Sequence, residues 1–417
     1  MSHNPSTMKH TYLLILSVFL FSCNQAQSDE ERSLNFDAGK DYFVDKITVD
    51  YAQNFSVSYH NNYKVVKATV SYGAAEQDSD SLSWIDAFTD VMVLVQRGTP
   101  VPPLTGELEG AHVIEIPVNT IAGNADDAPT RFLALEVDNK LLGLGHKDVY
   151  DPGLKARFDQ GELQEIGASW HTGPNFEVLL AIAPELTYLT AASLTQAEGV
   201  SRTRELGLKA APEFSWSETS YLGQLEWIKY DALFLNEEAQ ANKFFNEIKG
   251  RTDSLINLVK DVSDKPSAMW GMHSRSGNWT VRSNGGIAEL ITLAGAVNPF
   301  GDASAAITKT EANGLSEGIT ISDELVLQKA EDIDFIFSFQ STTGNWPTKA
   351  YMENFPAYRN KDLYHHFKRY KDYGASDWYQ SAPMRPDMLL SDMIKLFHPE
   401  LLPDHELFFL APIEITH

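Results

Sequence analysis

The sequence predicts an α/β protein made of two lobes that a long helix connects. Its 417 residues exceed the length of an ordinary single domain and favour two. From about residue 119 onward, short apolar runs alternate with helical patterns, which is typical of mostly parallel sheets covered by helices. Between residues 219 and 262 the apolar residues follow a helical period without any proline, so one long helix is expected there.

The beginning of the chain has the pattern of an export signal. Lys9 and His10 precede an apolar run over 12–21, and the run ends at Ser22 and Cys23. An apolar run of about 10 residues is too short to span a bilayer, which takes about 20. The pattern resembles a bacterial lipoprotein signal, in which the cysteine is acylated and becomes the first residue of the mature chain. A plain secretory signal with an incidental cysteine is the alternative.

These patterns divide the chain into five parts. A signal peptide over 1–22 precedes an acidic spacer over 23–45. An N-terminal α/β lobe with additional strands at its start covers 46–216, an interlobe helix covers 217–263, and a C-terminal α/β lobe covers 264–417. The expected location is the cell envelope, with lipid anchoring on the periplasmic side or exposure at the cell surface.

Each expected element follows from its local pattern. Alternating apolar residues predict N-terminal strands, arranged as an antiparallel sheet, at 47–49, 55–59, 65–70, 91–95 and 112–118. In the first lobe, helices are expected at 130–137 and 175–182, and strands at 141–145 and 186–190. After Pro266 the alternation resumes at 267–272, 286–294, 323–329, 334–339 and 387–397, with helices at 286–294 and 387–397.

Charge and motifs exclude several functions. With 33 basic and 57 acidic side chains the net charge is −24, which argues against a nucleic-acid partner because phosphate binding needs clustered basic residues. A single cysteine cannot form an intramolecular disulfide or a cysteine-rich zinc site. No Gly-x-Ser-x-Gly, His-Glu-x-x-His or phosphate-loop motif occurs, and the lone Gly143-Leu144-Gly145 is typical of a turn. We therefore do not expect an enzyme.

Candidate ligand-binding residues lie where strands are expected to end, because open α/β sheets bind ligands outside the carboxyl ends of their strands. Aromatic side chains offer large rigid faces, and arginines offer forks for anionic oxygens. The residues in such positions are Asn124, His171, Asn175, Trp279, Arg282, Gln340, Trp346, Trp378, Tyr379 and Arg385. The histidines at 365, 366, 398 and 405 are expected to be structural rather than metal ligands.

Four segments share their residue order with one known family. They read NFEVLLAIAPEL over 175–186, EWIKY over 226–230, NGGIAELITLAGA over 284–296 and RPDMLLSDMIKLFHPELLPDHE over 385–406. These segments resemble the periplasmic substrate-binding proteins of ABC importers for ferric siderophores and cobalamin. The resemblance covers about residues 113–407.

The resemblance implies two Rossmann-like lobes with central, mostly parallel sheets, joined by one long helix as in the helical-backbone class of these proteins. A ligand would lie between the lobes. Arg131 stands near the position of a histidine in the family, so it joins the candidate set. On this basis the anionic oxygens of an iron(III) chelate are expected to meet Arg131, Arg282 and Arg385, and its apolar part to meet Trp346, Trp378 and Tyr379.

The implied function is capture of an iron(III)-siderophore-type chelate by a monomer, without a cofactor or a directly bound metal. The partner would be an ABC permease/ATPase complex, docked through Glu226 or Glu289. The alternatives are a cobalamin or haem binder of the same fold, a bare-metal binder of the related zinc/manganese class, and a surface lipoprotein with a non-transport role.

Overall fold

The computed structural model describes residues 36–73, 84–169, 173–191, 193–275, 277–301 and 318–416. The predicted signal peptide, the predicted lipid-bearing Cys23, the start of the acidic spacer and the candidate His171 lie outside the described residues. In the part that the structure describes, no helix combines the length and the apolar character needed to cross a membrane.

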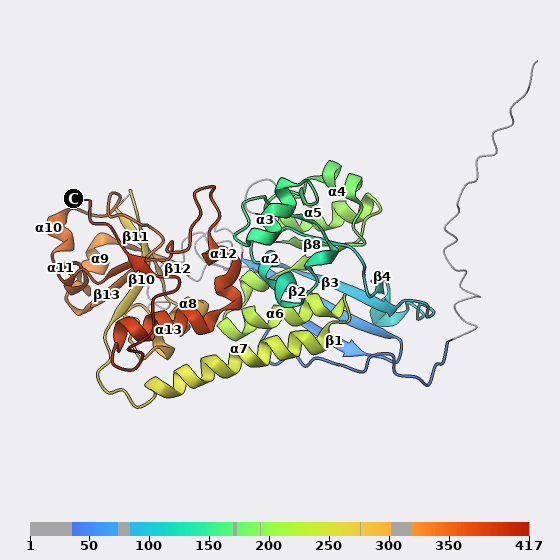
Figure 1. Cartoon of the computed structure of the whole chain (residues 1–417), viewed down its shortest axis with the longest axis horizontal. Coiled ribbons are helices and arrows are strands. Elements are labelled where there is room, and N and C mark those ends of the chain that lie inside the picture. Colours follow the sequence, from blue (N-terminus) through green and yellow to red (C-terminus); the bar gives the residue numbers. More distant parts are fainter. Residues whose placement is uncertain are drawn as a thin grey trace, which may run out of the picture.

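Two α/β lobes lie at opposite ends of the molecule, and helix α7 (Glu238–Val259) runs beneath both (Figure 1). This arrangement confirms the predicted two-lobed fold with a long helix between the lobes. The N-terminal lobe has a five-stranded sheet in which all neighbours are parallel. Its order is β7 (Gln164–Glu165), β6 (Leu141–Leu144), β5 (Ile121–Gly123), β8 (Leu186–Thr190) and β9 (Ala210–Glu213). Helices α2 (Ala128–Ala134), α3 (Pro152–Asp159), α4 (Phe176–Ile182) and α5 (Leu194–Glu205) belong to the same lobe.

The C-terminal lobe has a six-stranded mixed sheet. Its order is β12 (Gly318–Ser322), β11 (Asn278–Arg282), β10 (Ala268–Ser274), β13 (Phe335–Ser338), β14 (Leu363–His365) and β15 (Ala411–Pro412). Only β10, β13 and β14 are parallel. Alternate residues of β10 face two separate cores: Trp270 packs in the core shared with α13, and Met269 packs in a second core. The helices are α8 (Gly285–Leu293), α9 (Asp323–Leu327), α10 (Lys349–Met352), α11 (Pro356–Asn360), α12 (Asp377–Ser381) and α13 (Pro386–Phe397).

A separate four-stranded sheet precedes the first lobe. It is formed by β1 (Phe55–Tyr59), β2 (Tyr63–Gly73), β3 (Trp84–Gln96) and β4 (His112–Ile116), in that order. The strands β1, β2 and β3 are antiparallel as predicted. Strand β4 pairs with β3 in parallel, because residues 97–111 return the chain from the end of β3 to the level of Met92. The predicted antiparallel arrangement is therefore wrong for its last strand.

The predicted strand at 47–49 is also absent from the described chain, since the segment has no regular secondary structure and lies outside every sheet. Its polar groups bind side chains of the helices instead. The Lys229 ammonium donates to the Thr48 carbonyl oxygen (2.9 Å), and the backbone N–H groups of residues 50–52 donate to the carboxylate of Glu226 (2.7–3.1 Å). The segment thereby joins the additional sheet to helix α6 (Tyr221–Leu233).

The predicted single helix over 217–263 is wrong, because α6 ends at Leu233 and α7 begins at Glu238. Asn236 in the break has a positive φ of 56°. The fully buried ammonium of Lys64, from β2, donates to the Leu233 carbonyl oxygen (2.7 Å) and to Asn236 Oδ1 (2.9 Å), and pairs with Glu238. The buried cation therefore satisfies a carbonyl group at the end of α6 and pairs with the side chain of the first residue of α7.

Candidate functional site

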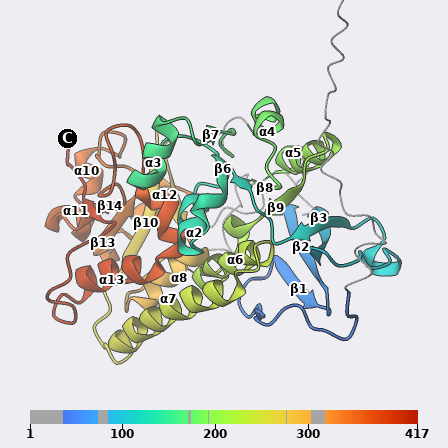
Figure 2. The ribbon, with the colours of Figure 1, turned by 45° about the vertical axis from the view of Figure 1, so that its right-hand side comes forward.

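The site candidate is the junction at which the C-terminal lobe reaches the N-terminal lobe. The chain following β5 and β6 approaches it from the N-terminal lobe, and the chain following β13 and β14 approaches it from the C-terminal lobe. Helix α12 packs against α2 there (Figure 2). Because strands of parallel sheets present their carboxyl ends at one edge, the junction collects the loops that bind ligands in such folds.

A segment of the C-terminal lobe, residues 369–380, makes direct hydrogen bonds to the N-terminal lobe. Gln380 donates to the Asp148 carbonyl oxygen (2.9 Å) and accepts from the Tyr150 backbone N–H (2.7 Å). The Tyr373 hydroxyl donates to the Val149 carbonyl oxygen (3.1 Å). The two lobes are therefore connected both by α7 and by this segment.

At the centre of the junction, charged and aromatic groups from both lobes meet. Asp126 follows β5 and lies 3.4 Å from His146 Nε2, which follows β6. Tyr379 on α12 is 45% exposed, and Arg282 at the end of β11 lies 5.0 Å from the ring centre of Phe339. Burial raises the pKa of the Tyr379 hydroxyl, Asp126 raises it further and Arg282 opposes the rise, which places all three groups within electrostatic range.

The pKa of His146 is also raised. The hydrogen bond to Asp126 is the largest cause, burial opposes it, and the carboxylates of Asp148 and Glu165 add to the rise. The carboxylates at this edge of the N-terminal lobe therefore favour the protonated form of His146.

Behind Tyr379 lies a buried aromatic cluster around His366. The ring of His366 is fully buried and lies 4.8 Å from Trp378, 5.0 Å from Phe339 and 5.8 Å from Tyr379 between ring centres. Burial lowers its pKa to about 3, so the imidazole is neutral. Its Nδ1 lies 3.3 Å from the Ser338 carbonyl oxygen, which can only accept, so the proton is on Nδ1. Nε2 then carries the lone pair, and it has no hydrogen-bond partner among the described residues.

Three candidate residues lie inside the C-terminal lobe instead of at the junction. Trp279 is fully buried and packs against Trp346, with ring centres 5.5 Å apart. The Trp346 indole N–H donates to Gln340 Oε1 (2.8 Å), and Gln340 also binds the backbone of His273 on both sides. The expected ligand contacts of Trp279 and Trp346 are therefore wrong, because strand β11 and the loop after β13 turn these two rings into the second core. Gln340 is half-buried, and its contact with a ligand stays a prediction.

Two of the three candidate arginines are committed to carboxylates. Arg131 is fully buried, and its guanidinium lies 2.8 Å from Asp127, 3.2 Å from Glu213 and 2.7 Å from Asp231. The expectation that Arg131 contacts a ligand is therefore wrong. Arg385 donates two hydrogen bonds to its neighbour Asp387 (2.9 and 3.1 Å) at the start of α13. Of the three, Arg282 is the one at the junction.

The two candidate asparagines have local structural roles. Asn124 is buried and its Oδ1 accepts from the backbone N–H of Thr190 (2.8 Å), which joins the ends of β5 and β8. Gly145 allows this approach, because a Cβ there would lie 2.8 Å from the Asn124 carbonyl oxygen. Asn175 is exposed and caps α4 by accepting from the Val178 N–H.

The two acidic residues proposed for docking differ in accessibility. Glu226 is fully buried and holds residues 50–52 and Lys229, so the expectation that it docks on a permease is wrong. Glu289 is half-buried and accepts from the Tyr221 backbone N–H (3.1 Å). A docking role of Glu289 stays a prediction.

Sequence reasoning missed Asp126, His146, Asp148 and Gln380. His146 could have been found, because it directly follows the predicted strand at 141–145 and ligands bind at the carboxyl ends of such strands. The contribution of Gln380 has no local signal, because it depends on a backbone contact between residues 230 or more positions apart. Within the described part of the chain, no group of three or more His, Cys, Asp and Glu side chains is arranged to hold a metal ion.

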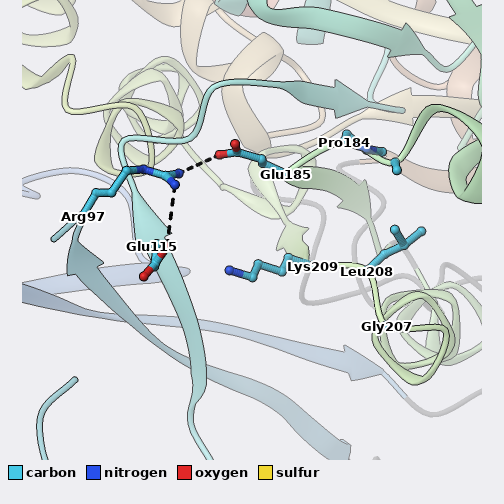
Figure 3. A pocket seen from close by; sticks show the side chains of 8 residues that line it. Arg97, Glu115, Pro184, Glu185, Gly207, Leu208 and Lys209 are labelled. Carbon is cyan, nitrogen blue, oxygen red and sulfur yellow. Dashed lines mark hydrogen bonds and ion pairs between the residues drawn. The ribbon is translucent and has the colours of Figure 1, made fainter. Parts of the chain in front are cut away.

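A pocket of about 380 Å³ lies at the amino ends of β8 and β9 (Figure 3). Its charged lining includes Arg97, which lies 2.8 Å from Glu185 and 3.6 Å from Glu115. These charges largely neutralise one another, and the pocket is at the edge of the sheet opposite to the junction. We therefore regard the junction as the better candidate.

One family model and two known proteins match the sequence of this chain. A model described as periplasmic binding protein matches residues 131–370. A protein of Methanocaldococcus jannaschii, named an uncharacterized lipoprotein, is 22% identical over 348 residues, which are 80% of this chain and 78% of that protein. A second uncharacterized lipoprotein of the same organism is 28% identical over 131 residues, 30% of this chain and 32% of its own length.

Solved structures share the fold at low identity. The Helicobacter pylori protein Ceue with Ni(II) bound is 14% identical, with a TM-score of 0.51, and the match covers 70% of this chain and 88% of that one. A periplasmic heme-binding protein from Pseudomonas aeruginosa is 14% identical, with a TM-score of 0.51, and the match covers 72% of this chain and 100% of that one. At such identities these matches establish the fold.

Proposed function

The chain belongs to the periplasmic binding protein family, and on that premise we propose that it captures an iron(III)-siderophore-type chelate between its lobes and delivers it to an ABC permease. Proteins of this family bind solutes for ABC importers, so the expectation of a binding protein and not an enzyme is confirmed. The observation that carries the proposal is the packing of α12, which bears the exposed Tyr379, against α2 of the other lobe, directly after Asp126 and the carboxyl end of β5.

The way the lobes are connected supports capture by a largely preformed site. Helix α7 extends beneath both lobes, and the bonds of Gln380 and Tyr373 join them a second time. A continuous helix resists the hinge bending that loop connections allow, so closure on a ligand should be small. Tyr379, being partly exposed, offers an aromatic face with a polar tip to an entering chelate.

Lipid anchoring through Cys23 is part of the proposal. It is supported by the signal-like pattern before Cys23 and by the lipoprotein names of the two Methanocaldococcus jannaschii relatives. An anchor would raise the effective concentration of the protein near its permease. A Cys23→Ala variant should lose the mass of the lipid and leave the membrane fraction, and retention in that fraction would contradict the anchor.

Tryptophan fluorescence tests the function. The mature chain in mild detergent contains eight tryptophans, of which Trp378 and Trp270 lie in the aromatic cluster at the junction. We expect saturable quenching at micromolar or lower concentration by one chelate from a panel of ferric hydroxamate, ferric catecholate, ferric citrate, cobalamin, haem and Zn²⁺. No response to any member of the panel would refute the importer function and leave the non-transport lipoprotein.

Matched variants locate the binding site. Tyr379→Ala should weaken binding of the responding chelate about tenfold, since a well-packed aromatic contact contributes about 1–2 kcal/mol. Tyr63→Ala, on β2 of the additional sheet, removes a similar ring far from the junction and should leave the affinity unchanged. Equal effects of the two variants would refute the placement of the site.

A haem or cobalamin ligand is the second candidate. It is favoured by the aromatic cluster, in which Trp270 stacks on Trp378 at 5.3 Å and the neutral His366 keeps an unpaired Nε2 among the described residues. Of the rings in contact with this cluster Tyr379 is 45% exposed, and an exposed aromatic face can stack on a flat macrocycle. Binding of haem or cobalamin in place of the other chelates would favour this candidate.

A further inference from the structure

We infer that the ligand of this chain is a chelate of neutral or positive net charge, selected against anionic chelates by the carboxylates of the N-terminal lobe. The inference rests on the proposed function and specifies the ligand class of the same site. It reverses the expectation from the sequence, in which three arginines meet the anionic oxygens of the chelate.

Two of the three arginines that were expected to bind an anionic chelate are held by carboxylates of the protein. Arg131 is buried among three carboxylates, and Arg385 is bound by both oxygens of Asp387. A guanidinium held by two hydrogen bonds to a carboxylate is no longer available as a fork for another anion. Of the arginines that an anionic chelate was expected to meet, Arg282 alone lies at the junction.

A row of carboxylates lies on the side of the N-terminal lobe. Asp126, Asp148 and Glu165 belong to the chain at the carboxyl ends of β5, β6 and β7, three neighbouring strands of one sheet. Among the described residues, neither Asp148 nor Glu165 has a basic side chain within 4.0 Å, and Asp126 has His146. The hydrogen bond to Asp126 is the largest cause of the raised pKa of His146, and the carboxylates of Asp148 and Glu165 add to the rise.

Two cations of the segment that joins the lobes have partners of their own. Arg369 is paired with Asp377 and also lies against the ring of Phe408 (4.1 Å). Lys371 lies 4.7 Å from the ring centre of Tyr150, on the segment that joins the lobes. Asp126 and its partner His146 are partly exposed, with 21% and 29% of their side-chain surfaces accessible, so a bound ligand can interact with them.

A series of chelates with different charges tests the inference. The mature chain is titrated with a linear ferric trishydroxamate that carries a free ammonium, with its N-acetylated neutral form, and with a ferric triscatecholate of triple negative charge. The ammonium form should bind about fivefold more tightly than the neutral form at low salt, and the preference should shrink as salt is raised. The triscatecholate should bind at least about tenfold more weakly than the neutral form.

Variants assign the preference to the carboxylates. Asp126→Asn should remove most of the difference between the ammonium and neutral forms, and Asp148→Asn provides a second variant of the same kind. Glu198→Gln, an exposed carboxylate on α5 of the same lobe, is the control and should keep the difference. Tightest binding of the triscatecholate, or an unchanged ratio in both Asn variants, would overturn the inference while the importer function stands. Absence of binding for every chelate would overturn the proposed function itself.

Discussion

Replacing Arg131 by Met should destabilise the N-terminal lobe strongly and in a pH-dependent way. The guanidinium of Arg131 is fully buried and lies within 3.2 Å of Asp127, Glu213 and Asp231, which are themselves buried. The variant keeps a side chain of similar length but leaves three carboxylates without their cation. Such a group of like charges in the protein interior must either be protonated or force the lobe to open.

The size of the loss in the free energy of unfolding follows from the burial of Arg131 and its partners. Removing one partner of a buried ion pair costs about 3–5 kcal/mol, because the other charge stays buried without compensation. Burial already raises the pKa of Asp231 to about 7, with Arg131 opposing the rise, whereas the usual value is 3.8. A carboxyl whose folded-state pKa is raised stabilises the fold below its unfolded pKa, and that contribution is lost as pH rises towards 7. Without Arg131 the pKa of Asp231 rises further, so the loss should be larger at pH 8 than at pH 5.

Urea unfolding at pH 5 and pH 8, followed by tryptophan fluorescence, measures this loss. The buried Trp227 on α6 reports on the N-terminal lobe. Arg202→Met is the matched control, because Arg202 is 58% exposed and pairs with Glu205 at the surface, where a pair contributes at most about 1 kcal/mol. A loss below about 1 kcal/mol for Arg131→Met at pH 8, or an equal loss at both pH values, would refute the reasoning.

Three further predictions concern the contacts that hold the lobes and the additional sheet. Lys64→Met should lower the free energy of unfolding by about 3–5 kcal/mol, since it leaves Glu238 buried without a cation, and urea unfolding measures this; a loss below about 1 kcal/mol would contradict the role of Lys64. Glu226→Gln should speed amide hydrogen exchange of residues 50–52 at least about tenfold, because the charged acceptor of their N–H groups is lost, and unchanged exchange rates would speak against it. Gln380→Ala should broaden the distance distribution between spin labels on α4 and α11, as both of its hydrogen bonds to the other lobe disappear; an unchanged distribution would show that α7 alone sets the geometry.

Local patterns predicted most of the regular elements correctly. Strand β1 occupies residues 55–59 as expected, and α13 begins at Pro386 and ends at Phe397, one residue from the prediction at its start. Helix α4 likewise begins after Asn175, whose side chain accepts from the Val178 N–H. Such elements are predictable because their period, capping residue and first proline act within a few positions along the chain.

The candidate site was predicted less well, because exposure depends on distant parts of the chain. Trp378 and Tyr379 on α12 and Arg282 do gather near the junction. The strand that ends at Arg282 is antiparallel to β10, however, so its position does not follow from the carboxyl ends of parallel strands. Arg131 follows a strand of a parallel sheet, but it is buried in ion pairs with Glu213 and Asp231 and cannot reach a ligand. These two residues are 82 and 100 positions further along the chain. A single sequence shows which residues carry charge, but not which of those charges neutralise one another after folding.

The sequence by itself determined the α/β class, the two lobes and the family, since periodicity and ordered motifs are properties of neighbouring residues. Only the tertiary structure decided where the helix between the lobes breaks and which charges face the ligand. Lys64 ends α6 at Leu233 across 169 positions, because a buried ammonium must find acceptors wherever the fold supplies them. The same requirement buries Arg131 and leaves Asp126, Asp148 and Glu165 at the edge of the sheet. Pairing of buried charges is a property of the folded molecule, and it determines what remains available for binding.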